Sequence, residues 1–514
     1  MMTQSERIFL PLWKKIILII ISTIFLAIEL LLLFAVLDVS FTYSFSSIKW
    51  IYFLTLGISI CFCIYIMYRP MSANYKLIWV TLILILPLPF CFLYLFNSSS
   101  RRLSKRKMAK VENALKHFNN VGVLNKLKLE NKDAANLCSI VQYSAYAPVY
   151  DNTTVLFFSD CEKKFYDLLN ETKKAKHYIY IESFIVANGF LMDNLYEVLK
   201  ERGEAGVEIK ILYDDVGSRG VMTQKLLKKL AEIKNCNITN YEPLGININP
   251  VVNNRNHRKV YIIDGIVSYC GGDNLADEYI HKKQRFGYWR DNCLKFVGEA
   301  TKTFVIDFIE MWYLSTRNVL QIDYKPEYKN DFKGYVMPFS DGPANKGYPA
   351  YDLFMGLIST AKSYIYISTP YFIIDDPMIS LISLKAKSGV KVVLLTPAIP
   401  DKKSVFYMTR GNYRELLKSG AIIYEYTPGF NHAKNIIVDD IYAFGGTINM
   451  DYRSLFLHYE CGSLLLFNPE ISAMKKDYEA AISVSEEITM DKWIKRPWYQ
   501  KLIAFILNIF APMF

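Results

Sequence analysis

The chain has 514 residues, 52% of them hydrophobic, and a formal net charge of +11. This length allows two or three domains. A basic chain could bind nucleic acid or anionic lipid, but the long apolar runs in its first hundred residues favour lipid and argue against a nuclease or another nucleic-acid-binding protein. The nine cysteines have no CxxC spacing, so we interpret them as free thiols and not as a zinc site or a disulfide framework.

Three apolar runs, at 16–37, 51–67 and 77–96, make residues 1–97 a predicted membrane anchor of transmembrane helices. A helix that spans a bilayer needs about 20 apolar residues. The positive-inside rule places the N-terminus in the cytoplasm, but three full spans would put the basic cluster at 101–110 outside. We therefore expect one run not to cross fully, which leaves the catalytic part on the cytoplasmic side.

Residues 98–145 are polar and basic and are predicted to form a helical linker. Strand-like and helical segments alternate from about residue 149 onward, which is typical of an α/β fold. The first of these strands are predicted at 178–186, 207–213, 259–264 and 266–270, with a helix at 192–202.

The α/β pattern recurs, which indicates two tandem copies of one unit. YIYIESFIV returns as YIYISTPYF, AGVEIKILYDD as SGVKVVLLTPA, and NHRKVYIIDG as NHAKNIIVDD, all in the same order. The predicted halves are 146–330 and 331–490. The remaining apolar segment, 491–514, either docks on the domain or lies in the membrane interface.

Each copy contains the string H-x-K-x₄-D-x₆-G-x₂-N, with identical spacing. A lone H-x-K pair on a strand is usually a surface feature, but the full string at matching places in a repeat indicates function. A non-catalytic scaffold would have no use for two intact copies. The predicted catalytic residues are His257, Lys259, Asp264, His432, Lys434 and Asp439, and the predicted supporting residues are Gly272, Asn274, Gly446 and Asn449.

These residue types suit a phosphodiester. A neutral imidazole can attack phosphorus and form a phosphohistidine, and a protonated imidazole can give its proton to the leaving alcohol. Lysine and asparagine side chains can hold the non-bridging oxygens. One motif supplies only one histidine, so two motifs that face each other are expected to form one composite site. This chemistry requires no metal and no cofactor.

A histidine nucleophile needs its other ring nitrogen held, usually by a carboxylate. Asp291 and Glu460 each follow a motif at the start of an apolar run, and we predict that they orient the histidines. Asp264 and Asp439 have an alternative role, the closing of a turn. The other histidines, including His458, are predicted to be structural or solvated.

At this point the sequence resembles a known family. The two strings are similar to the HKD motifs of the phospholipase D superfamily, and the flanking residues resemble those of bacterial cardiolipin synthases. The resemblance covers about residues 50–514. It departs at Asp273, where a hydrophobic residue is common, and at His458, where asparagine is more usual. The segments that carry the resemblance are LYDDVGSRG, GGDNLADEY, GYWRDNCLKFVG, TPYFIIDDP, EYTPGFNHAK and GTINMDYRS.

The resemblance implies N-terminal transmembrane helices followed by a duplicated phospholipase D-like α/β domain. The protein is then expected to be a multi-pass protein of the bacterial cell membrane. It implies that two phosphatidylglycerol molecules react to give cardiolipin and glycerol. By analogy His257 is the nucleophile and His432 the general acid and then base, although the sequence does not decide between them. The alternatives are a hydrolytic phospholipase D or a phosphatidyltransferase with another alcohol acceptor.

Overall fold

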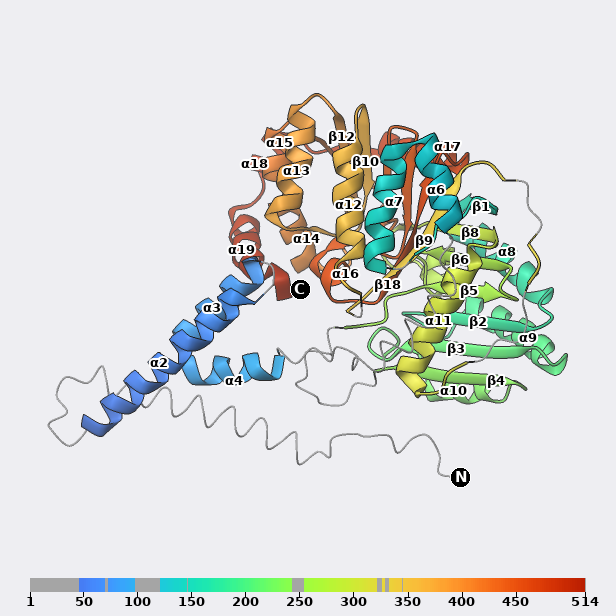
Figure 1. The fold of residues 1–514 in the computed structure, drawn as a ribbon, viewed down its shortest axis with the longest axis horizontal. Coiled ribbons are helices and arrows are strands. Elements are labelled where there is room, and N and C mark those ends of the chain that lie inside the picture. Colours follow the sequence, from blue (N-terminus) through green and yellow to red (C-terminus); the bar gives the residue numbers. More distant parts are fainter. Residues whose placement is uncertain are drawn as a thin grey trace. The chain divides into compact units, whose positions relative to one another are not determined.

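The computed structural model describes residues 46–69, 73–97, 121–145, 147–242, 254–320, 326–328, 332–343 and 345–513. They fall into two compact units. The first contains the N-terminal helices and the last residues of the chain, and the second contains both repeats (Figure 1).

The N-terminal unit consists of α2 (Ser46–Tyr68), α3 (Ala73–Ile85) and α4 (Pro87–Asn97). The three helices pack on one another around a small apolar cluster. The buried members of this cluster are Cys63, Ile66, Trp79, Ile83, Cys91 and Tyr94.

The apolar run at 77–96 does not form one helix. Proline has no backbone N–H to donate, and the chain divides at Leu86, directly before Pro87. At 1.5 Å per residue, α3 and α4 are about 20 and 17 Å long, whereas the hydrocarbon core of a bilayer is about 30 Å thick. Among the described residues, no helix is both long and apolar enough to cross a membrane, so the predicted transmembrane helices are not confirmed there. The predicted span at 16–37 lies outside the described residues.

The first repeat forms a seven-stranded sheet in the order β1-β8-β6-β5-β2-β3-β4. β2, β3 and β4 are parallel, and β5, β6, β8 and β1 continue the sheet with antiparallel pairs. The strands are β1 (Thr153–Phe158), β2 (Tyr178–Ser183), β3 (Glu208–Asp214), β4 (Cys236–Tyr241), β5 (Val260–Ile263), β6 (Val267–Gly271) and β8 (Cys293–Gly298).

The second repeat forms an eight-stranded sheet in the order β9-β18-β16-β15-β10-β12-β13-β19. Apart from the additional edge strand β19, this is the strand order of the first sheet, which confirms the predicted duplication. The strands are β9 (Tyr335–Asp341), β10 (Tyr364–Ser368), β12 (Lys391–Pro397), β13 (Ile422–Tyr426), β15 (Asn435–Val438), β16 (Tyr442–Gly446), β18 (Glu460–Leu466) and β19 (Ser485–Glu487).

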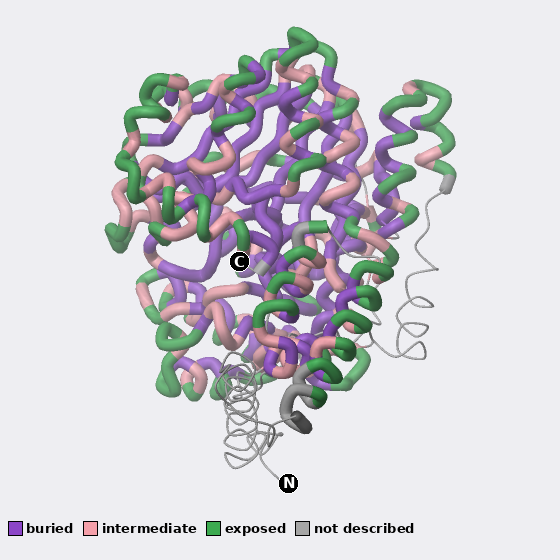
Figure 2. The backbone as a smooth tube through the Cα atoms, turned by 90° about the vertical axis from the view of Figure 1, so that its left-hand side faces the viewer, coloured by how far each residue is buried: buried purple, intermediate pink, exposed green. Residues whose placement is uncertain are grey.

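Helices cover the outer face of each sheet, and their apolar sides are buried against it. α8 (Cys161–Lys173), α9 (Phe190–Glu204) and α10 (Gln224–Ala231) cover the first sheet. α12 (Pro349–Thr360), α13 (Asp376–Lys387) and α15 (Tyr413–Lys418) cover the second. Figure 2 shows this burial in the second unit, where buried backbone lies at the centre and exposed stretches lie on the helices at the periphery.

The inner faces of the two sheets share one core with α11 (Thr301–Thr316) and α17 (Glu470–Ser483). Equivalent aromatic stacks hold the two helices. Tyr180 lies on Phe308 and Tyr366 lies on Tyr478, each with ring centroids 4.8 Å apart. The duplicated units are therefore two halves of one packed body.

The predicted basic linker does not behave as a linker where it is described. α7 (Lys132–Ala145) packs on α12 and β9 and belongs to the core of the second half. Four of the buried apolar residues of α7 repeat at helical spacing and so lie on one face of the helix. These are Ala134, Leu137, Cys138 and Val141.

Candidate active site

Each half extends a short segment to the other, and both motif histidines lie on these segments. β14 (Gly429–Asn431) pairs with β7 (Tyr288–Arg290), and Asn256 forms an equivalent parallel bridge with Tyr459. The backbone N–H of His432 donates to the carbonyl of Arg290 over 2.7 Å, and that of His257 donates to Tyr459 over 2.8 Å. The two histidines are therefore fixed in equivalent positions at the junction.

The predicted orienting carboxylates are present, but they are exchanged between the halves. Nδ1 of His257 lies 2.9 Å from Glu460, which belongs to the second half, and Nδ1 of His432 lies 2.6 Å from Asp291, which belongs to the first. All four side chains are nearly or fully buried. A carboxylate on Nδ1 leaves Nε2 as the reactive nitrogen, as in a serine–histidine–aspartate triad. Neither half can provide a complete histidine–carboxylate pair alone.

The motif lysines lie beside the histidines. Nζ of Lys259 donates to the backbone carbonyl of His257 over 2.5 Å, and Lys434 makes the same contact with His432. Both lysines are buried, which lowers the pKa of each to about 8. At neutral pH they are mainly charged, so two cations adjoin the paired imidazoles.

The motif glycines permit close approach of the backbone. A Cβ on Gly272 would lie 2.1 Å from a carboxylate oxygen of Asp291, and one on Gly446 would lie 2.5 Å from the Cα of Gly462. A side chain at Gly272 would therefore displace the carboxylate that orients His432.

The two motif asparagines differ in their contacts. The amide of Asn274 donates to the hydroxyl of Tyr279 over 2.6 Å, and its oxygen accepts from the backbone of Ile185. The buried side-chain oxygen of Asn449 has no hydrogen-bond partner in the structure. Asn274 therefore holds a loop in place, whereas Asn449 keeps polar capacity for a ligand.

The motif aspartates lie at the far ends of β5 and β15 from the histidines. Asp264 accepts hydrogen bonds from the backbone N–H groups of residues 176–178, and Asp439 accepts them from those of residues 362–364. Both residues have positive φ, as is common in tight turns. This geometry favours the turn-closing role over the catalytic one for both aspartates.

The pKa values of the two histidines suit nucleophilic attack. Burial lowers the pKa of His257 to about 3 and that of His432 well below its usual value, so both are neutral at pH 7. Burial raises the pKa of Asp291 to about 6. For Glu460 the effect of burial is outweighed by His257 and His458, and its pKa is lowered. A nearby anion, such as a phosphodiester, would favour the imidazolium form and raise these pKa values.

His458 lies beside the candidate site, and the sequence reasoning did not place it there. Its ring lies 5.6 Å from that of His257, and its Nδ1 lies 3.6 Å from Glu460. The equivalent residue in the other half is Trp289, with its ring 5.6 Å from that of His432. Their positions in the sequence were the available signal, because His458 and Trp289 each lie two residues before an orienting carboxylate. His257, His458 and Glu460 are also the group of metal-capable side chains found within the described residues.

Further buried contacts hold the motif strands, and these were also missed. Arg255 pairs with Asp214 over 3.0 Å, and the same carboxylate accepts from the backbone of Asn256. In the second half, Arg290 donates to the side chain of Asn431 over 2.7 Å. Each histidine thus follows an asparagine that is fixed by a buried polar network.

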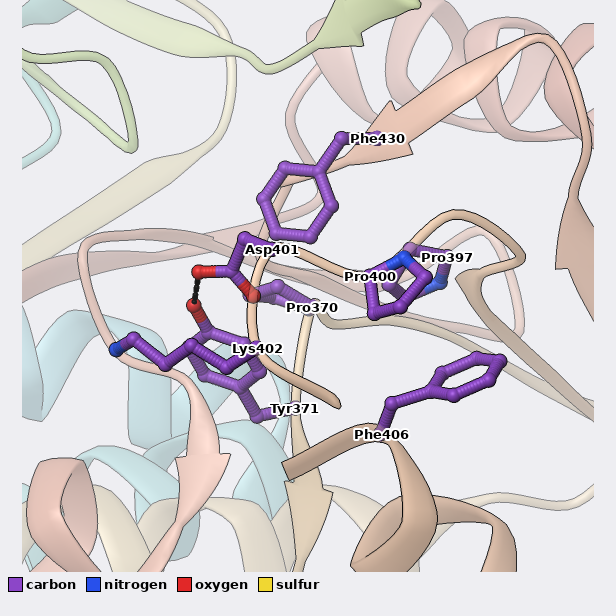
Figure 3. Close-up of a pocket in the computed structure, with 8 residues that line it drawn as sticks. All are labelled: Pro370, Tyr371, Pro397, Pro400, Asp401, Lys402, Phe406 and Phe430. Carbon is purple, nitrogen blue, oxygen red and sulfur yellow. Dashed lines mark hydrogen bonds between the residues drawn. The ribbon is translucent and has the colours of Figure 1, made fainter. Parts of the chain in front are cut away.

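Figure 3 shows a small pocket in the second half, with Phe430 among the residues that line it. The ring of Phe430, in its wall, lies 5.6 Å from that of His432. The hydroxyl of Tyr371 donates to Asp401 over 2.5 Å, and Lys402 adds positive charge that lowers the pKa of His432. The pocket is lined by Pro370, Tyr371, Pro397, Pro400, Asp401, Lys402, Phe406 and Phe430.

Comparison with known proteins assigns the chain to a family. The sequence model of the family described as "Cardiolipin synthase, PLD-like domain" matches residues 168–304 and 354–492, one segment in each half. This chain belongs to that family. A cardiolipin synthase 2 of Bacillus cereus is 35% identical over 68% of this chain and 69% of its own length. An uncharacterised protein of Streptococcus mutans is 34% identical over 76% of this chain and 85% of its own length.

Solved structures support the fold assignment of this cardiolipin synthase family member. The phosphatidylserine synthase of Haemophilus influenzae aligns with a TM-score of 0.55 at 14% identity, covering 74% of this chain and 98% of its own. At this identity the likeness concerns the fold alone. The family match makes the chain a phosphatidyltransferase of the phospholipase D superfamily, and the likeness in fold supports its duplicated α/β domain.

The unusual Asp273 has a structural explanation. Its carboxylate lies 2.7 Å from Nζ of Lys164, and both side chains are buried. The ammonium of Lys164 also lies 3.9 Å from the ring centroid of Tyr261. A buried carboxylate is tolerated here because a buried cation pairs with it.

Proposed function

We propose that the chain joins two phosphatidylglycerol molecules into cardiolipin and releases glycerol. The observation that carries this proposal is the pair of histidines whose Nδ1 atoms contact carboxylates from the opposite half. This arrangement provides a nucleophile and a proton carrier in one site, as two-step transfer to an alcohol requires.

In the first step, Nε2 of His257 attacks phosphorus, and the bond from phosphorus to the glycerol oxygen breaks. The imidazolium of His432 gives its proton to that oxygen, and glycerol leaves. In the second step, neutral His432 removes the proton from a hydroxyl of the second phosphatidylglycerol, whose oxygen attacks phosphorus and releases His257. The assignment of the nucleophile follows the family resemblance.

Lys259 and Lys434 would stabilise the charge that builds on the non-bridging oxygens. Both are buried, so little water screens them. Asn449, with its unpartnered oxygen, lies in the motif where it could contact a hydroxyl of the substrate.

Membrane association is part of the proposal. Large apolar side chains are exposed along α2, including Phe53, Leu54, Ile58 and Ile64, and such patches mark sites of membrane or protein contact. We place the protein in the bacterial cell membrane with its catalytic part on the cytoplasmic side. Cysteine labelling from each side of the membrane at residues 101–110 tests this, and labelling only from outside would contradict it.

A second region supports contact with lipid. α19 (Trp498–Ile509) exposes Trp498, Leu502, Phe505 and Ile506, and its sequence includes Lys501. An apolar helix face with nearby cations is typical of helices that lie in an anionic membrane interface. Leu502→Glu together with Phe505→Glu should reduce flotation with phosphatidylglycerol vesicles, whereas Lys476→Glu on α17 is the surface control. Unchanged flotation of the double variant would contradict a role of α19.

The reaction is tested with purified protein in phosphatidylglycerol vesicles. We expect cardiolipin and glycerol in equal amounts. Phosphatidic acid as the sole product would contradict the synthase and support the hydrolytic phospholipase D. Addition of ethanolamine or serine tests the remaining alternative, a transferase with another alcohol acceptor, because a preferred small alcohol would divert the phosphatidyl group from cardiolipin.

A further inference from the structure

The site has an asymmetry that the transfer mechanism does not use. On the His257 side, three side chains place one possible metal-ligating atom each within 4.8 Å of the others. They are His257, His458 and Glu460. On the His432 side, Trp289 occupies the position equivalent to His458, and an indole cannot ligate a metal through a lone pair.

His458 has unused ligating capacity. Its side chain is 11% exposed, and neither ring nitrogen has a hydrogen-bond partner. A polar ring this deeply buried without a partner is costly unless it gains one in another state of the protein. A carboxylate oxygen of Glu460 lies 3.6 Å from Nδ1.

We propose that His257, His458 and Glu460 form a reversible inhibitory site for Zn²⁺. Zinc forms bonds of about 2.0–2.2 Å in tetrahedral geometry, which places its donor atoms roughly 3.4 Å apart. The observed distances to Glu460, 2.9 Å from His257 and 3.6 Å from His458, lie on either side of this value. Small side-chain movements would therefore form a site with two nitrogen donors and one carboxylate oxygen.

The donor set selects the metal class. Imidazole and carboxylate suit Zn²⁺, whereas Mg²⁺ and Ca²⁺ prefer oxygen ligands alone. Three protein ligands leave a fourth position for water or a lipid phosphate oxygen. Lys259, whose charge also acts on His257, opposes a dication and keeps the binding reversible.

A bound ion would stop transfer. It would replace the hydrogen bond between Nδ1 of His257 and Glu460, so the histidine would lose the proton and the partner that set its reactive tautomer. Only this inhibitory consequence rests on the proposed function. The binding of zinc does not depend on it.

Binding is measured on full-length, tag-free protein in detergent, dialysed against Zn²⁺ without lipid. We expect about one more zinc ion per chain in the wild type than in His458→Asn. His281→Asn, at a histidine outside the site, is the matched control and should bind as the wild type does. Equal zinc content of His458→Asn and the wild type would overturn the proposal.

X-ray absorption at the zinc edge needs no variant and keeps the test valid if His458→Asn fails to fold. The expected spectrum shows imidazole and oxygen ligands, whereas sulfur ligands would place the ion on cysteines and overturn the proposal. Each protein's transfer rate is then compared with its own zinc-free rate. The wild type should lose activity at least roughly tenfold, reversibly with chelator, and His458→Asn should lose much less.

A failure of the zinc site can be distinguished from a failure of the proposed transferase function. Zinc bound with imidazole ligands to a protein that forms no cardiolipin even without zinc would contradict the proposed function and leave the metal site intact. Zinc bound in stoichiometric amount without any loss of transfer would show that the ion does not engage His257, which overturns the site as proposed.

Discussion

The two halves of the catalytic unit have the same strand order, the same histidine–lysine pair and the same turn-closing aspartate, yet they differ next to the histidines. His257 has His458 and Glu460 as neighbours, whereas His432 has Trp289 and Asp291. Duplication supplies two equivalent imidazoles, and the neighbours make them chemically distinct. A two-step transfer gives the two imidazoles different roles, because one histidine must bond to phosphorus while the other carries a proton.

The largest expected effect tests whether both halves are essential. His257→Ala and His432→Ala should each lower the transfer rate by at least about 10⁴-fold. Both histidines act in the same reaction, so the loss of either one removes most of the catalysis. The measurement is cardiolipin formation from phosphatidylglycerol vesicles. His177→Ala, at an exposed histidine, is the control and should retain activity. Substantial activity in either active-site variant would mean that the halves act independently.

The second prediction concerns the exchanged carboxylates. Glu460→Gln and Asp291→Asn should lower kcat by roughly 10²- to 10⁴-fold, because an amide holds the wrong tautomer of its histidine. In double variants, Glu460→Gln should add little to His257→Ala, its partner across the halves. If Glu460→Gln instead lowers the residual rate of His257→Ala by its full single-variant factor, the exchanged pairing is wrong.

A third prediction uses the lysines, whose pKa values are lowered to about 8 by burial. They carry charge below this pH and lose it above, so kcat/KM should fall as pH rises through about 8. With two such groups, the slope of log(kcat/KM) against pH should approach −2, and in Lys259→Arg or Lys434→Arg it should approach −1. A pH-independent rate between 7 and 10 would contradict a charge role for either lysine.

The smallest effect should come from the motif aspartates. Asp264→Asn and Asp439→Asn each weaken bonds to three backbone N–H groups, so we expect losses of about 1–3 kcal/mol in the free energy of unfolding. Activity at low temperature should persist in both. Denaturant titration measures the first quantity. If either variant keeps wild-type stability but loses turnover, that aspartate is catalytic after all.

Much of the fold was predictable because the chain is repeated. The strands at 178–186 and 207–213 correspond to β2 and β3, since buried apolar runs at matching places in two copies leave few alternatives. The helical linker predicted at 98–145 is a helix where it forms α7, but α7 belongs to the core of the second half and is not a linker. Its charged residues obscured an apolar stripe whose partner, α12, lies two hundred residues away.

The sequence predicted which residues belong to the site, but not which carboxylate contacts which histidine. Spacing identified Asp291 and Glu460, but proximity in sequence does not reveal that each serves the histidine of the other half. His458 was assigned to the structural histidines, because its role depends on the contact with His257, 201 residues earlier in the chain. Long-range packing decides such contacts, and the position of His458 two residues before Glu460 does not show which histidine it faces.

The central claim is that two halves make one site with one nucleophile. Its most direct test is the number of phosphatidyl groups bound per chain, measured by mass spectrometry after alkaline quenching of protein mixed with labelled phosphatidylglycerol. We expect at most one group, always on the same motif histidine, and none in the variant that lacks this histidine. Labelling of both His257 and His432 in the same chain, or of neither under any condition of turnover, would contradict it.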